Sequence, residues 1–125
     1  MNATLTGIAL MDARIVDLVT FRRDGTPVRT PVLSTPRGGD LLIRTHHTAG
    51  KLKRLRRNPA VEVTPCDGRG RHLGAVERGT ATILPEVQTA ECLSLLHYRH
   101  GLIGRGSTFL RHLFGRDVFI EVRLA

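Results

Sequence analysis

The sequence has no tryptophan, only two cysteines and no long apolar run. A membrane-spanning helix needs roughly 20 apolar residues in a row, so no membrane span is expected. The first ten residues also lack the basic start and apolar run of a secretory signal peptide. Cys66 and Cys92 form no CxxC pair. These features predict a reducing, cytoplasmic setting without a disulfide framework.

Aromatic residues are scarce too, whereas basic residues are abundant. Lysine and arginine number 19 against 11 aspartates and glutamates, which gives a formal net charge of +8. Such an excess favours an anionic partner, which at this point includes nucleic acid, anionic lipid and a phosphorylated cofactor. Proteins that read single-stranded nucleic acid pair basic grooves with exposed aromatic platforms. Most aromatic residues here lie in apolar runs, and no known nucleic-acid-binding motif occurs, so no nucleic-acid partner is expected.

The length of 125 residues predicts one domain over residues 1–125. Within it, residues 1–14 are weakly patterned, and we expect either a short helix or poor order there. A chain this short does not easily enclose a whole cofactor. A binding site shared between two subunits would solve that difficulty.

The hydrophobic pattern predicts about six strands and two inserted helices. Asp24-Gly25 marks a tight hairpin turn, Pro27 and Pro31 place their strand at a sheet edge, and Gly79 indicates a bulge. Consecutive antiparallel pairs favour a small closed or partly closed barrel. The expected strands are Ala13–Arg22, Pro27–Thr35, Leu41–Thr45, Val61–Pro65, Ala75–Leu84 and Asp117–Leu124. The expected helices are Thr48–Arg57 and Pro85–His100, with a helical turn at Leu110–Phe114.

The start of the first expected helix carries the clearest chemical signal. Free backbone N–H groups at a helix start bind anions, and Gly50 lets a phosphate approach them closely. Lys51 adds a positive charge, and Lys53 and Arg54 extend it. The segment is not a P-loop, because that motif needs glycine at position 45 and serine or threonine at position 52. The alternative is a solvated basic helix face whose leucines turn to the core.

The remaining polar residues form no recognisable catalytic set. The histidines have no spacing that brings three ligands together, so no metal site is predicted. No base is paired with either cysteine by spacing, and the catalytic residues stay unknown. Flavin-type enzymes need few such groups, because the cofactor supplies the hydride chemistry and the protein positions it.

Several segments, in their order and spacing, resemble the pyridoxamine 5′-phosphate oxidase-like FMN-binding split-barrel superfamily. The likeness covers roughly residues 15–125 and is greatest to the actinobacterial branch of probable coenzyme F420-dependent enzymes. The segments are Val19–Val32, Arg44-Thr45, Gly50–Pro59, Pro65–Gly70, Gly79–Pro85 and Ile120–Arg123. The resemblance implies a mainly β fold, a six-stranded antiparallel Greek-key split barrel with two or three short helices. It also implies a homodimer with two cofactors at the subunit interface.

The resemblance also implies which residues bind the cofactor. Thr30, Pro31 and Val32 would line the flavin-type ring. Arg44 and Thr45 would reach its phosphate or ribityl region. Gly50, Lys51, Lys53 and Arg54 would bind its phosphate, and Cys66 and Asp67 would lie where the partner subunit approaches the ring.

Two departures from the FMN oxidases bear on the cofactor. Those enzymes typically carry arginine where this chain has Thr30, and an aromatic residue where it has Arg44. The departures favour the deazaflavin F420, whose polyanionic tail suits a basic chain. We therefore expect an F420-dependent oxidoreductase that transfers a hydride between reduced cofactor and a small electron-poor substrate. The alternatives are an FMN-dependent oxidoreductase of the same fold and a non-catalytic carrier of a cofactor or tetrapyrrole.

Overall fold

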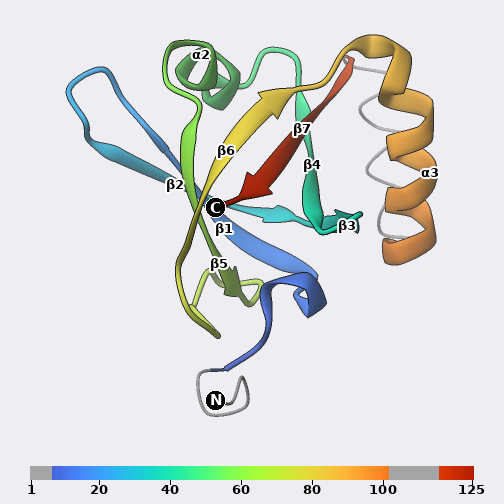
Figure 1. The fold of residues 1–125 in the computed structure, drawn as a ribbon, viewed down its shortest axis with the longest axis horizontal. Coiled ribbons are helices and arrows are strands. Elements are labelled where there is room, and N and C mark those ends of the chain that lie inside the picture. The colour runs from blue at the N-terminus through green and yellow to red at the C-terminus, as the bar shows by residue number, and fades with distance from the viewer. Residues whose placement is uncertain (1–6, 102–115) are drawn as a thin grey trace.

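The computed structural model describes residues 7–101 and 116–125 of the chain, and its architecture is mainly β (Figure 1). The predicted helical turn at Leu110–Phe114 lies outside these residues. The strands are β1 (Ile15–Phe21), β2 (Pro27–Leu33), β3 (Thr35–Arg37), β4 (Asp40–His46), β5 (Ala60–Cys66), β6 (Glu77–Ile83) and β7 (Asp117–Leu124). The helices are α2 (Gly50–Arg57) and α3 (Thr89–His100), with 3₁₀ turns η1 (Leu10–Asp12) and η2 (Glu86–Gln88).

All seven strands belong to one antiparallel sheet in the order β2-β1-β5-β6-β7-β4-β3. The sheet curls into a half-barrel, with α2 over one end and α3 along one side (Figure 1). Side chains of alternate residues along each strand point into the curl and form the main core. The buried members of this core are Leu10, Ala13, Val16, Leu18, Leu41, Ile43, Leu52, Leu55, Val61, Val63, Ala81, Ile120 and Val122.

The β1–β2 hairpin forms where the sequence predicts it, although only one of the two turn residues has a positive φ. Gly25 has φ of 90°, whereas no described residue other than glycine has a positive φ. The carboxylate of Asp24 instead accepts a 2.9 Å hydrogen bond from the N–H of Thr26. Strand β2 lies at one end of the sheet order, so the edge position predicted from Pro27 and Pro31 is confirmed.

The sheet has one strand more than the six predicted, because the chain leaves the β1–β2 ladder at Ser34. The N–H of Ser34 donates to the carbonyl of Arg14 at 2.9 Å. Its own carbonyl faces His100 Nε2 at 3.0 Å and accepts from Arg99 Nε at 3.2 Å. These contacts end β2 and start β3, which pairs with β4 at the other end of the sheet.

The bulge predicted at Gly79 is wrong, because β6 pairs continuously with both of its neighbours through this residue. The missing side chain serves close packing instead. A Cβ at Gly79 would lie 2.8 Å from the carbonyl oxygen of Arg123 and 3.0 Å from Cγ1 of Val122. Both neighbours belong to β7, so glycine lets the two strands approach each other.

Helix α3 is fixed to the sheet by a second, smaller core and by Arg37. Leu42, Phe119, Cys92 and Leu96 are buried together between the sheet and the helix. Arg37 donates to Glu121 of β7 at 2.9 Å and to Glu91 of α3 at 3.1 Å. The hydrogen bond to Glu121 raises the pKa of the Arg37 guanidinium. The side of the sheet under α3 is therefore occupied by structural contacts.

Among the described residues, no helix combines the length and the apolar character that crossing a lipid bilayer requires.

Replacement of Gly79 by alanine is expected to destabilise the protein by about 1–3 kcal/mol, because the added methyl group overpacks the β6–β7 contact. Urea unfolding of the variant measures this difference. Gly68→Ala is the matched control, since a Cβ at Gly68 meets no atom within 4 Å. Equal urea midpoints for the two variants would show that the added methyl group at Gly79 does not change the free energy of unfolding.

The pKa of the buried His100 side chain predicts how the stability of the protein changes with pH. Burial, followed by the charges of Arg99, Arg14 and Arg44, lowers the pKa of His100 despite its hydrogen bond to Ser34. The unfolded chain then takes up the proton more readily than the folded chain. The neutral form of His100 contributes its full share to the free energy of unfolding above pH ~6.5, the usual histidine pKa. That share is lost as the pH falls toward the lowered pKa of His100 in the folded protein. Thermal melts at pH 7.5 and 5.5 should show a smaller difference for His100→Gln than for the wild type.

Candidate functional site

The basic helix α2 begins at Gly50, two residues later than predicted, because the preceding residues form a turn. Thr48 Oγ1 lies 2.7 Å from His46 Nδ1, and the N–H of Ala49 donates to the carbonyl of His46 at 2.9 Å. This turn follows directly from the end of β4. It places the start of α2 beside the end of the half-barrel, and the N–H of Leu52 donates to the carbonyl of Ala49 at 3.1 Å.

Arg54 folds back over this helix start. A Cβ at Gly50 would lie 3.1 Å from Nη1 of Arg54, so only a small residue leaves room for the guanidinium. On its other side, Arg54 Nε donates a 2.7 Å hydrogen bond to Thr20 Oγ1 of β1. The guanidinium is therefore held between the helix start and the sheet.

The surroundings of Arg54 are positively charged. Burial lowers the pKa of its guanidinium, and the charges of Arg22 and Arg57 lower it further. Among residues 7–101 and 116–125, no carboxylate forms an ion pair with Arg54. We name these residues the α2 cluster: Thr20, Arg22, Gly50, Arg54 and Arg57. An anion at this position would relieve the mutual repulsion of the arginines.

Four further predicted site residues lie on the same side of the sheet or on α2 itself. Thr30 and Val32 are opposite Leu18 and Val16 of β1, whose side chains belong to the core. They therefore face the inside of the curl, as Thr20 does. Lys51 is half-buried and Lys53 exposed, both on α2.

Strand β4 presents its two predicted site residues to opposite faces. Thr45 follows the core residues Leu41 and Ile43 in the inward row and is itself buried. Arg44 points to the side covered by α3, where its Nε lies 3.9 Å from Oδ1 of Asp117. The structure thus places Arg44 apart from the start of α2.

Pro31 and Cys66 lie on the outer face of the sheet instead. Pro31 is opposite Asp17 of β1, and Cys66 pairs with Ile15 and forms an isolated bridge with His72. Asp67 follows Cys66 in the adjoining loop. Its carboxylate accepts from the N–H groups of Arg69 and Arg71 and from Arg71 Nε at 2.7 Å. These bonds to Arg71 and Arg69 lower the pKa of Asp67, and they engage the carboxylate within its own loop.

The outer face also holds a group of residues that the sequence reasoning missed. We name Asp17, Arg29 and His72 the outer cluster. Oδ2 of Asp17 lies 2.8 Å from Nε2 of His72 and accepts from Arg29 Nη1 at 3.2 Å. Asp17 is buried in the middle of β1. An aspartate inside the apolar run Ile15–Phe21 is the signal that would have indicated it.

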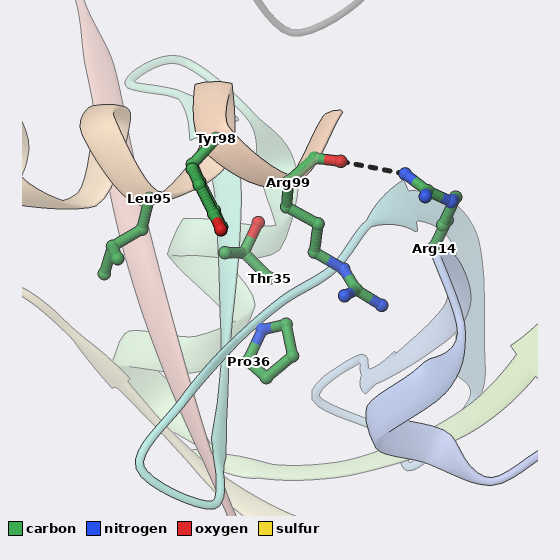
Figure 2. Close-up of a pocket in the computed structure, with 6 residues that line it drawn as sticks. All are labelled: Arg14, Thr35, Pro36, Leu95, Tyr98 and Arg99. Atoms are coloured by element: carbon green, nitrogen blue, oxygen red, sulfur yellow. Dashed lines mark hydrogen bonds between the residues drawn. The ribbon is translucent and has the colours of Figure 1, made fainter. Parts of the chain in front are cut away.

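A cavity lies elsewhere, between α3 and β3, and has a volume of about 660 Å³ (Figure 2). The two arginines beside it are engaged with backbone carbonyls. Arg14 Nη1 donates to the carbonyl of Arg99, while the Arg99 guanidinium donates to carbonyls of Met11, Ala13 and Ser34. Among the described residues, no group of three histidine, cysteine or carboxylate side chains could hold a metal ion.

The two thiols predict a simple reactivity experiment. Burial is the main cause that raises the pKa of both Cys66 and Cys92, and the carboxylates of Asp17 and Asp67 add to the shift at Cys66. Since the thiolate is the reactive form, both should react slowly with Ellman's reagent at pH 7 in the folded protein. Two thiols per chain should then appear rapidly in denaturant. Fast reaction of either thiol in the folded protein would contradict its buried placement.

No family model and no curated protein sequence matches the chain. Solved structures do match it. An F420 reductase aligns with a TM-score of 0.65 and 23% identity over 93% of this chain and 90% of its own. HutZ, the heme storage protein of Vibrio cholerae, aligns with a TM-score of 0.68 and 15% identity over 91% and 83%.

A third similar structure is a putative pyridoxamine 5′-phosphate oxidase from Listeria innocua. It aligns with a TM-score of 0.59 and 17% identity over 89% of this chain and 83% of its own. At these identities the likeness concerns the fold. The chain therefore has the split-barrel fold shared by pyridoxamine 5′-phosphate oxidase-like proteins, an F420 reductase and a heme storage protein, as the resemblance in its sequence implied.

Proposed function

We propose that the protein is a deazaflavin (F420)-dependent oxidoreductase that works as a homodimer in the cytoplasm. The observation that carries this proposal is Arg54 of the α2 cluster, whose guanidinium lies against the start of α2, close to the charges of Arg22 and Arg57, without an acidic partner among the described residues. The phosphodiester and glutamates of the F420 tail are anions of the kind that such a cluster binds. The similarity of the fold to that of an F420 reductase supports the same cofactor.

The predicted cofactor-binding residues have different tasks in this proposal. Gly50, Lys51, Lys53 and Arg54 would hold the phosphate, while Thr30 and Val32 would line the flavin-type ring and Thr45 would reach its phosphate or ribityl region. Pro31 and Cys66 lie on the outer face of the sheet and Asp67 in the adjoining loop, which suits a contribution to the site of a partner subunit. Arg44 stays a predicted cofactor residue, although its contact with Asp117 favours a structural role.

The chemistry then divides between cofactor and protein. A bound deazaflavin would supply the hydride. The protein would mainly bind and orient the cofactor and the substrate. The guanidinium of Arg54 is already fixed by Thr20, so little side-chain freedom is lost when an anion binds. Exclusion of water by the curled sheet would strengthen the charge–charge contact further.

The test is a titration of ligand-free protein with F420, FMN and hemin, comparing the wild type with Arg54→Met. Loss of a charge-assisted hydrogen bond costs about 1.5–3 kcal/mol, so the dissociation constant for F420 should rise about tenfold or more. Arg123→Met is the matched control, because Arg123 is an exposed arginine of β7. Its dissociation constant should stay at the wild-type value.

Each other result points to a specific alternative. Equal affinities of the two variants for F420 would remove the α2 cluster from the binding site. Tight binding of FMN in place of F420 would assign the chain to the flavin oxidoreductases of this fold. Selective binding of hemin would favour a tetrapyrrole carrier, the function named for the Vibrio cholerae protein of the same fold.

A further inference from the structure

The outer cluster has the geometry of a histidine held by a buried carboxylate. The side chain of Asp17 is 5% exposed, whereas that of His72 is 36% exposed. Oδ2 of Asp17 meets both His72 Nε2 and Arg29 Nη1. Within the described residues, Oδ1 of the same carboxylate is buried and has no hydrogen-bond partner. Only one of the two Asp17 carboxylate oxygens therefore accepts hydrogen bonds from the described residues, and His72, which contacts that oxygen, reaches the surface.

This arrangement determines which ring nitrogen of His72 can accept or donate a proton at the surface. A carboxylate 2.8 Å from Nε2 favours the tautomer that carries hydrogen on Nε2. The described contacts of the ring, with Asp17 and with Arg29 at 3.4 Å, both involve Nε2. Nδ1 is therefore the nitrogen that accepts or donates a proton at the surface. Orientation of an imidazole by a buried aspartate is how acid–base histidines are held in hydrolases.

Other acidic groups on this face suit the task less well. Asp17 is itself out of contact with solvent. The Cys66 thiol is buried, and the carboxylate of Asp67 is engaged by its own loop. Histidine is also the side chain whose ordinary protonation range includes neutral pH. His72 is therefore better suited to carry a proton than Asp17, Cys66 or Asp67.

We propose that His72, oriented by Asp17, is the proton donor of the reaction catalysed at the proposed deazaflavin site of the partner subunit, to which the outer face of this chain contributes. This inference rests on the proposed function. Two of the residues expected to lie near the ring flank the pair, since Pro31 is opposite Asp17 in the β1–β2 ladder and Cys66 bridges to His72. Asp17 acts as a positioning residue, because its contact is with the histidine and not with the substrate.

The step balances in atoms and electrons. A reduced deazaflavin, when bound, would supply a hydride to the electron-poor carbon of an activated double bond. The π pair of that double bond moves to the neighbouring atom, which takes the proton from Nδ1 of the His72 imidazolium. His72 is left neutral and regains its proton from water. General acid catalysis of this kind contributes about 10²–10⁴-fold to a rate.

The first experiment examines the ligand-free protein by ¹⁵N-detected NMR of the histidine rings. The expected result is hydrogen on Nε2 of neutral His72 and a bare Nδ1, with the ring shifting toward a mixture of tautomers in Asp17→Asn. A neutral ring with hydrogen on Nδ1 would overturn the proposal without reference to any cofactor. Thermal melts show whether the Asp17 variant remains folded.

The second experiment follows oxidation of reduced F420 in a single turnover, with cyclohex-2-en-1-one and menadione as acceptors. His72→Gln should slow the faster reaction about 100-fold while leaving the dissociation constant for F420 within about twofold. His97→Gln, a histidine on α3, is the matched control and should keep the wild-type rate. An equal rate in the two variants overturns the proton-donor role and leaves the proposed function standing.

The remaining outcomes separate the two proposals. A wild type that binds no F420 overturns the proposed function and the donor role that rests on it. A wild type that binds F420 but oxidises it with neither acceptor contradicts catalysis, and the donor role falls with it. A His72→Gln variant with weakened F420 binding and unchanged turnover would make His72 a binding residue instead.

Discussion

Successive side chains of β1 point to opposite faces of the sheet, and most of the other features depend on this alternation. Val16 and Leu18 belong to the inward row that fills the core, and Thr20 in the same row anchors Arg54. Asp17 belongs to the outward row and binds His72. A shift of β1 by one residue would exchange the two rows, so one register determines the core, the α2 cluster and the outer cluster together.

The fold by itself does not select a ligand, since its relatives are named for such different molecules as F420 and heme. Selection must come from side chains placed on that fold. The net charge of +8 is not evenly balanced over the surface, because Arg37 is ion-paired with carboxylates whereas Arg54 is surrounded by other arginines. The difference between these two arginines distinguishes a structural cation from one that is available to an anionic ligand.

Local patterns predicted most of the strands, both helices and the turn at Gly25, because each depends on neighbouring residues. The sequence could not distinguish a bulge from close strand packing at Gly79, since both require the same missing side chain. Nor could it show that the carbonyl of Ser34 bonds to side chains of α3. Asp17 and His72 are 55 positions apart, and only the pairing of β1 with β5 brings them together. Their spacing along the chain therefore does not predict that they form a pair.

The two prolines of β2 have a consequence for solubility. Residues of an edge strand alternately direct their N–H groups toward the neighbouring strand and toward solvent. Pro27 and Pro31 are opposite Phe21 and Asp17 at positions where the N–H would point away from β1. The open edge of β2 therefore lacks two of the donors that another chain would need in order to add a strand. The half-barrel, which leaves this edge open, is thereby protected against edge-to-edge aggregation.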